Sequence, residues 1–100
     1  MKKFKALYKG IYDDLKDAEM MINYACKIKE NSEDAALADE IAKYANSRLN
    51  HALDFHKLLI NEAKKQNDTS VDSVNKCLWE ETHEMMQEWY NSIKSKVEKY

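Results

Sequence analysis

The sequence predicts an all-α protein, an antiparallel bundle of three long helices. The 100 residues include no Pro and one Gly, so the residue types that interrupt helices are almost absent. Apolar residues recur at spacings of three and four over long segments, whereas no long segment alternates apolar and polar residues as a half-buried strand does. A chain of this length suits one domain, which we place at residues 1–100.

The first helix is expected at about residues 2–30. Its apolar seam alternates spacings of four and three, as in a helix that packs nearly parallel to its neighbours. The seam consists of Phe4, Tyr8, Ile11, Leu15, Ala18, Ile22 and Ala25. Asp14 and Glu19 border this seam. We expect Glu19 to pair with a Lys or with Tyr44.

The second helix is expected at about residues 33–65, after Asn31 and Ser32, which suit a helix N-cap. Two adjacent apolar rows give it a face wide enough for more than one neighbour. The first row is Ala38, Ala42, Ala45, Leu49, Ala52, His56, Leu59 and Ala63, and the second is Leu37, Ile41, Tyr44, Arg48, His51, Phe55 and Leu58. The alanines predict that one neighbour approaches closely, and we expect His56 to be a core or interface residue.

The third helix is expected at about residues 71–99, after a polar break at residues 66–70. Its stripe is rich in aromatic residues and Met, which fill cores and are also favoured in interfaces. We interpret five of these residues as core side chains that also offer an interaction surface: Trp79, Met85, Met86, Trp89 and Tyr90.

Composition excludes several function classes. A net charge of −2 with 34% charged residues of both signs disfavours a nucleic-acid binder. No apolar run is long enough to cross a membrane or to form a signal-peptide core, so we expect a cytoplasmic protein. Cys26 and Cys77 lack metal or redox spacings and suit reduced thiols. Without a Gly-rich phosphate loop or a nucleophile–base pattern, the chain favours a non-enzymatic role.

A polar layer interrupts the apolar rows. Arg48 and His51 lie one turn apart, and counting about 1.5 Å per residue from the first turn places Asp14, His83 and Glu84 at the same level. In one interpretation, Asp14, His51, His83 and Glu84 hold a metal inside the bundle. In the other, Arg48 pairs with Asp14 and Glu84. Arg has no lone pair and repels a cation, so the sequence favours the ion pair and no bound cofactor.

Three segments resemble the ferritin-like (rubrerythrin-like) superfamily, closest to the small ferritin-like proteins of phages and prophages of Gram-positive bacteria. They are DLKDAEMMINYACKIKE at 14–30, SRLNHALDFHKLL at 47–59 and VNKCLWEETHEMMQEW at 74–89. The second segment resembles the Glu-Leu-x-His-Ala pattern followed by Leu-His. The resemblance covers most of the chain and implies a ferritin-like bundle.

In metal-binding members of that superfamily, the first helix supplies a Glu and the second a Glu-x-x-His. In this chain His51 matches the His, Asp14 stands in place of the first Glu, and Arg48 stands in place of the second. The resemblance therefore implies a degenerate metal site. Glu80 and His83 form a Glu-x-x-His in the third helix, which leaves a displaced site as an alternative.

The function predicted from these observations is a non-enzymatic helical binding protein, with a homodimer or higher homo-oligomer as its assembly. For a phage or mobile-element protein, a host protein is the implied partner. The alternative is a metal-binding protein that holds iron or manganese in a site completed across a dimer.

Overall fold

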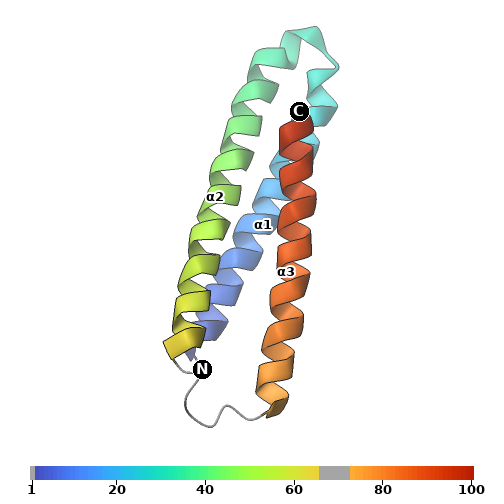
Figure 1. Ribbon diagram of the computed structural model, residues 1–100. Helices are drawn as coiled ribbons and strands as arrows, with labels where there is room; N and C mark the ends of the chain where they lie inside the picture. Colours follow the sequence, from blue (N-terminus) through green and yellow to red (C-terminus); the bar gives the residue numbers. More distant parts are fainter. Residues whose placement is uncertain (1, 66–72) are drawn as a thin grey trace.

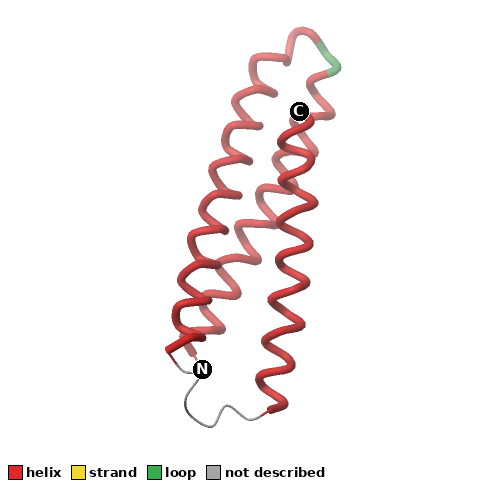
Figure 2. The backbone as a smooth tube through the Cα atoms, viewed as in Figure 1, coloured by secondary structure: helices red, strands yellow, loops and turns green. Residues whose placement is uncertain are grey.

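The computed structural model describes residues 2–65 and 73–100, and the side chains of residues 6–62 and 84–100. In this part of the chain the protein consists of three α-helices, namely α1 (Lys2–Lys29), α2 (Ala35–Lys65) and α3 (Ser73–Lys99), with the short 3₁₀ helix η1 (Ser32–Asp34) between α1 and α2 (Figure 1). The described segments contain no strand (Figure 2). The predicted all-α class is confirmed, and the expected helix bounds that fall in the described part of the chain lie within two residues of the observed ones, whereas the expected start at residue 71 lies outside that part.

Each helix runs antiparallel to the one before it, so α1 and α3 point the same way (Figure 1). The described chain is a rod of 58 × 17 × 17 Å. No described helix combines the length and the apolar character that crossing a lipid bilayer requires.

Helices α1 and α2 form the tightest pair in the described structure. Small side chains from both helices are fully buried along their interface: Ala18, Ala25, Ala38, Ala45 and Ala52. Gly10 extends this close approach, because a Cβ atom built on it would lie 3.2 Å from the ring of Phe55. The close contact predicted from the alanine row is therefore confirmed.

Helix α3 packs on this pair through Ile93, which is fully buried. Around it, Met86, Trp89, Tyr90 and Val97 are half-buried against the core.

At the end of the bundle that carries the α1–α2 turn, side chains of α1 and α2 contact Tyr100, the residue that follows α3. The ammonium group of Lys29 donates a hydrogen bond to the main-chain oxygen of Tyr100 and lies 4.2 Å from the centre of its ring. The hydroxyl of Tyr100 donates to Asp39 at 2.7 Å. One end of the bundle is thus tied together by polar contacts.

The turn between α1 and α2 is closed by main-chain hydrogen bonds. Asn31 donates from its main-chain N–H to Ile28 at 3.0 Å and accepts from the N–H of Asp34 at 2.9 Å. The side chain of Asn31 makes no capping hydrogen bond. Asn31 thus occupies the N-cap position of η1, as its residue type indicates, but the tight 3₁₀ turn satisfies these groups through the main chain instead of the side chain. The predicted polar break at residues 66–70 lies outside the described residues.

Candidate functional site

An ion-pair cluster, made of Asp14, Asp17, Arg48 and His51, joins α1 to α2. Its residues come in two pairs, each with a spacing of three along its own helix, so each pair lies on one helix face. Nη1 of Arg48 lies 3.4 Å from Oδ1 of Asp14, and Nη2 of Arg48 donates to Oδ2 of Asp17 at 2.5 Å. Nδ1 of His51 lies 2.6 Å from Oδ2 of Asp14.

Asp14 is the buried member of the cluster. It is 3% exposed and is the only charged residue buried among the side chains that the structure describes. A carboxylate removed from water needs partners that replace its hydration. Arg48 supplies a positive charge to one oxygen, and His51 donates from Nδ1 to the other.

Arg48 is held firmly in its charged form. Its hydrogen bond to Asp17 raises the pKa of the guanidinium, and the charges of Asp14, Asp17 and Asp13 raise it further. Desolvation opposes these effects but does not outweigh them. Arg48 Nε is buried and has no hydrogen-bond acceptor among the described residues. The cluster therefore carries a fixed cation facing two acids.

His51 has one ring nitrogen occupied and one available. Because Nδ1 is bound to Asp14, Nε2 is the nitrogen that remains for another contact. The ring of Phe55 packs edge-on against the imidazole, with 4.7 Å between ring centres and 83° between planes. A carboxylate that orients a histidine in this way also occurs behind metal ligands and general bases. Among the described residues, however, no three His, Cys, Asp or Glu side chains gather into a metal-binding group.

The structure brings together three of the residues predicted for the polar layer and replaces a fourth. Asp14, Arg48 and His51 meet as expected. Glu84 is exposed and forms no ion pair with Arg48, so the predicted Arg48–Glu84 pair is wrong and Asp17 takes that place. The side chain of His83, together with those of Glu80 and Trp79, lies outside the described residues.

Glu84 misses the cluster because α3 packs on the opposite side of the α1–α2 pair from the cluster. Trp89 is the α3 residue that meets the middle of α1: its ring centre lies 5.4 Å from that of Tyr12, and its Nε1 donates to Glu19 at 3.0 Å. At about 100° per residue, Asp14 projects about 160° around α1 from Tyr12, so the cluster faces away from α3. The count of turns gave the height of Glu84 along the bundle, but not the side of the α1–α2 pair that α3 covers.

These contacts correct one further sequence expectation and add one residue that the sequence analysis missed. Glu19 binds Trp89, not a Lys or Tyr44. Asp17 was not predicted as a partner of Arg48, although its spacing of three from Asp14 was visible in the sequence.

The residues predicted for an interaction surface divide into two groups. Met86, Trp89 and Tyr90 are half-buried within the chain itself. Met85 is 70% exposed and remains available to a partner.

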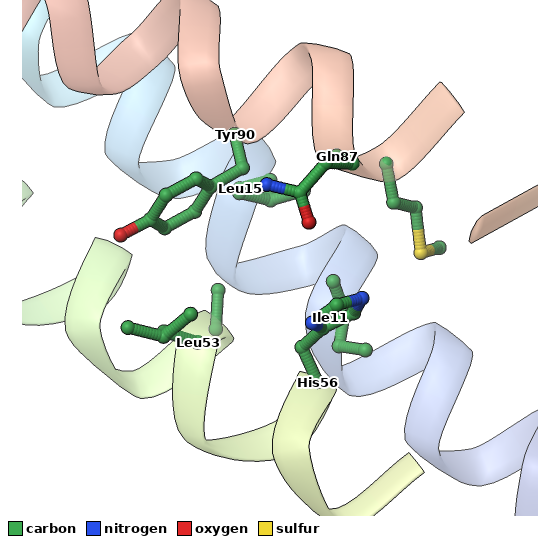
Figure 3. A pocket seen from close by; sticks show the side chains of 8 residues that line it. Ile11, Leu15, Leu53, His56, Gln87 and Tyr90 are labelled. Carbon is green, nitrogen blue, oxygen red and sulfur yellow. The ribbon is translucent and has the colours of Figure 1, made fainter. Parts of the chain in front are cut away.

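A shallow recess lies between the three helices (Figure 3). It has a volume of about 260 Å³, including the open solvent at its mouth, and is lined by Ile11, Leu15, Ala52, Leu53, His56, Met86, Gln87 and Tyr90. His56 is half-buried there, as expected for a core or interface residue. The recess offers one imidazole and one amide in an apolar lining, which is not a set that holds a metal.

Comparisons of the sequence and structure with protein families, curated proteins and solved structures found no match. The ion-pair cluster is therefore interpreted from its own chemistry.

Proposed function

We propose that this protein is a non-enzymatic helical binding protein, built on a ferritin-like scaffold in which an ion-pair cluster occupies the place of the metal site. The observation that carries the proposal is the position of Arg48. Its guanidinium stands between Asp14 and Asp17, within salt-bridge distance of both. These carboxylates already have a permanent positive partner.

The charge of Arg48 works against a metal at this position. At about 4 Å, two unit charges in a partly exposed site repel each other by about 4 kcal/mol, and a divalent ion doubles that value. Arg cannot lose its proton to relieve the repulsion, and it has no lone pair to offer an ion. The three hydrogen-bond and ion-pair contacts at Asp14 and Asp17 fill the role that a cation would otherwise play.

The binding role is supported by the large apolar side chains on the surface. Leu37, Tyr44 and Leu58 are exposed on one face of α2, and Met85 is exposed on α3. Clusters of such residues on a small protein mark contact sites for other proteins. The proposed partner is therefore a protein, and for a chain of phage origin it is a host protein.

A second candidate, an iron- or manganese-binding protein, is favoured by the contact between Asp14 and His51. A carboxylate bound to one nitrogen of a histidine frequently orients the other nitrogen toward a metal. In this candidate His51 is a ligand, and Asp14, His83 and Glu84 assist in a site completed by a second copy of the chain.

Metal analysis of protein purified without an affinity tag separates the two candidates. We expect less than about 0.1 equivalent of iron, manganese or zinc per chain after dialysis against each metal, a level that indicates no structural site. His51→Ala and His56→Ala form a matched pair, because both remove an imidazole from α2. A stoichiometric metal that is lost in His51→Ala and kept in His56→Ala would overturn the proposal.

The reverse substitution gives a second readout. Arg48→Glu restores the Glu-x-x-His spacing with His51 and removes the repelling cation. If the scaffold still has the geometry of a metal site, this variant gains affinity for iron or manganese that the natural chain lacks. Arg48→Gln is the control, since it removes the charge without adding a ligand carboxylate.

A further inference from the structure

Helix α2 carries a second apolar row that α3 does not reach and that α1 covers along one edge only. This outer seam alternates spacings of four and three, and it consists of Leu37, Ile41, Tyr44, Arg48, His51, Phe55, Leu58 and Glu62. Four residues of the outer seam are exposed, namely Leu37, Tyr44, His51 and Leu58. The other four are half-buried. Such a repeat is the signature of a helix that packs along another helix.

The outer seam faces away from α3. Helix α3 meets α2 around the recess that Leu53 and His56 help to line (Figure 3). At about 100° per residue, Leu53 projects about 160° around the helix from His51. On α1, the neighbouring flank continues with Asp17, Met21 and Tyr24, which are all half-buried or exposed. The surface therefore spans both helices of the α1–α2 pair.

The outer seam reads in the same chemical order from either end. Its midpoint lies between Leu49 and Asn50, and reflection about that point pairs residues of the same kind. Ile41 falls opposite Leu58, Tyr44 opposite Phe55, and Arg48 opposite His51. Leu37 falls opposite Glu62 at the ends, the one mixed layer. A two-fold symmetric interface requires this kind of self-complementary surface.

We propose that a second copy of this chain docks antiparallel on the outer seam, about a two-fold axis that passes α2 between Leu49 and Asn50. This inference goes beyond the proposed binding function, because it adds a second copy of the chain as a binding partner. In the dimer, apolar layers lie on both sides of a central polar layer formed by the two ion-pair clusters.

Charge favours this arrangement at the centre. Arg48 and Asp17 have side chains that are 42% exposed, so both reach the face that the second copy covers. Across the axis, the guanidinium of each copy lies opposite His51 of the other, and the exposed carboxylate of Asp17 borders the same layer. A parallel dimer in register would place Arg48 directly on Arg48, whereas the antiparallel register sets it opposite His51. An antiparallel slip of seven residues would bury Arg48 against Leu58 or Tyr44. The polar layer thus selects one orientation and one register.

The available surface is large enough for a stable dimer. One side of the rod, 58 Å by 17 Å, has a projected area of about 1,000 Å². A standard protein–protein interface needs about 800 Å² from each partner.

Light scattering coupled to size-exclusion chromatography tests the assembly. We expect the natural chain to have twice the mass of one 11.8 kDa chain at about 100 μM, a concentration at which an interface of this size is occupied. Tyr44→Glu places a charge in the aromatic layer and is expected to yield a monomer. Met85→Glu is the matched control, because Tyr44 and Met85 are 63% and 70% exposed and only Tyr44 lies on the outer seam. Circular dichroism checks that both variants keep their helices.

A monomeric natural chain would overturn the inference, and so would a Tyr44→Glu variant that stays dimeric. Neither result affects the ion-pair proposal, because metal analysis tests that proposal independently.

Thiol crosslinking tests the orientation. In a background of Cys26→Ser and Cys77→Ser, chains carrying Ile41→Cys are mixed with chains carrying Leu58→Cys and treated with a short bismaleimide. We expect crosslinked dimers in the mixture and none with either variant alone, since two copies of residue 41 lie about 25 Å apart in the antiparallel register. Crosslinking of each variant with itself indicates a parallel dimer and contradicts the inference, as does an uncrosslinked mixture.

Discussion

Nδ1 of His51 lies 2.6 Å from Oδ2 of Asp14, and the other oxygen of that carboxylate lies 3.4 Å from Arg48. The buried carboxylate of Asp14 on α1 is thus shared by Arg48 and His51 on α2. The four residues differ in burial, because Asp14 is buried whereas Asp17, His51 and Arg48 reach the surface. This difference determines how much each contact contributes to the stability of the fold. The contacts of Asp14 should therefore contribute more to stability than the shorter contact of Asp17.

Removing each acid in turn tests this difference. Asp14→Asn leaves Arg48 with one carboxylate and His51 with a neutral partner, and it is expected to lower the free energy of unfolding by about 2–3 kcal/mol. Asp17→Asn removes a partly exposed pair and should cost less than about 1 kcal/mol. Urea denaturation followed by circular dichroism measures both values. Equal losses would show that burial does not control the strength of the cluster.

Removing Arg48 leaves the buried carboxylate of Asp14 without its permanently charged partner. Arg48→Ala is expected to lower the free energy of unfolding by about 3 kcal/mol or more. Replacing the pair with apolar residues, Asp14→Leu with Arg48→Met, should recover much of that loss, because no buried charge remains. The double variant is compared with each single variant in the same urea titration. A loss below about 0.5 kcal/mol in Arg48→Ala would mean that water solvates the cluster.

The hydrogen bond between Trp89 and Glu19 fixes α3 against α1. Trp89→Phe keeps an aromatic ring beside Tyr12 but removes the donor, and it is expected to cost about 1–2 kcal/mol, since a hydrogen bond to a charged acceptor is lost. Glu19→Gln retains an acceptor oxygen and should cost less. Thermal unfolding of the two variants gives the comparison. A larger loss in Glu19→Gln would mean that charge, not the hydrogen bond, dominates this contact.

Two tyrosines make stability fall at high pH. Burial raises the pKa of Tyr8 to about 12, and desolvation together with the hydrogen bond to Asp39 raises the pKa of Tyr100 to about 12, compared with an ordinary value of 10. Between pH 10 and 12 the unfolded chain loses these protons while the folded chain keeps them, so unfolding becomes easier as pH rises. Their contribution is fully present below pH 10.

The measurement is the thermal midpoint from pH 9 to 12. The natural chain should lose stability across this range, and Tyr8→Phe and Tyr100→Phe should each show a shallower decline. Tyr24→Phe is the control, because Tyr24 is exposed. Identical slopes in all four proteins would contradict the assignment.

The sequence predicted the α1–α2 pair best, because one short turn connects these two helices. The apolar rows fixed the faces of α1 and α2, and the turn at Asn31 fixed their relative height, so Asp14, Arg48 and His51 were placed together correctly. The side of the α1–α2 pair that α3 covers depends on how Trp89, Tyr90 and Ile93 fit against that pair, and the spacing of residues along one helix does not contain this information. This is why Glu84 was placed too close to Arg48 and why Trp89 was not recognised as the partner of Glu19.

The uneven packing of the three helices has a consequence for how the protein opens. Over the described residues, α1 and α2 share far more contact than α3 makes with either. Local unfolding follows such differences in contact, so amide hydrogens of α3 should exchange with solvent before those of the α1–α2 pair. Both the ion-pair cluster and the outer seam belong to that pair. An α1–α2 hairpin that stays folded while α3 detaches would keep the face that recognises a second chain.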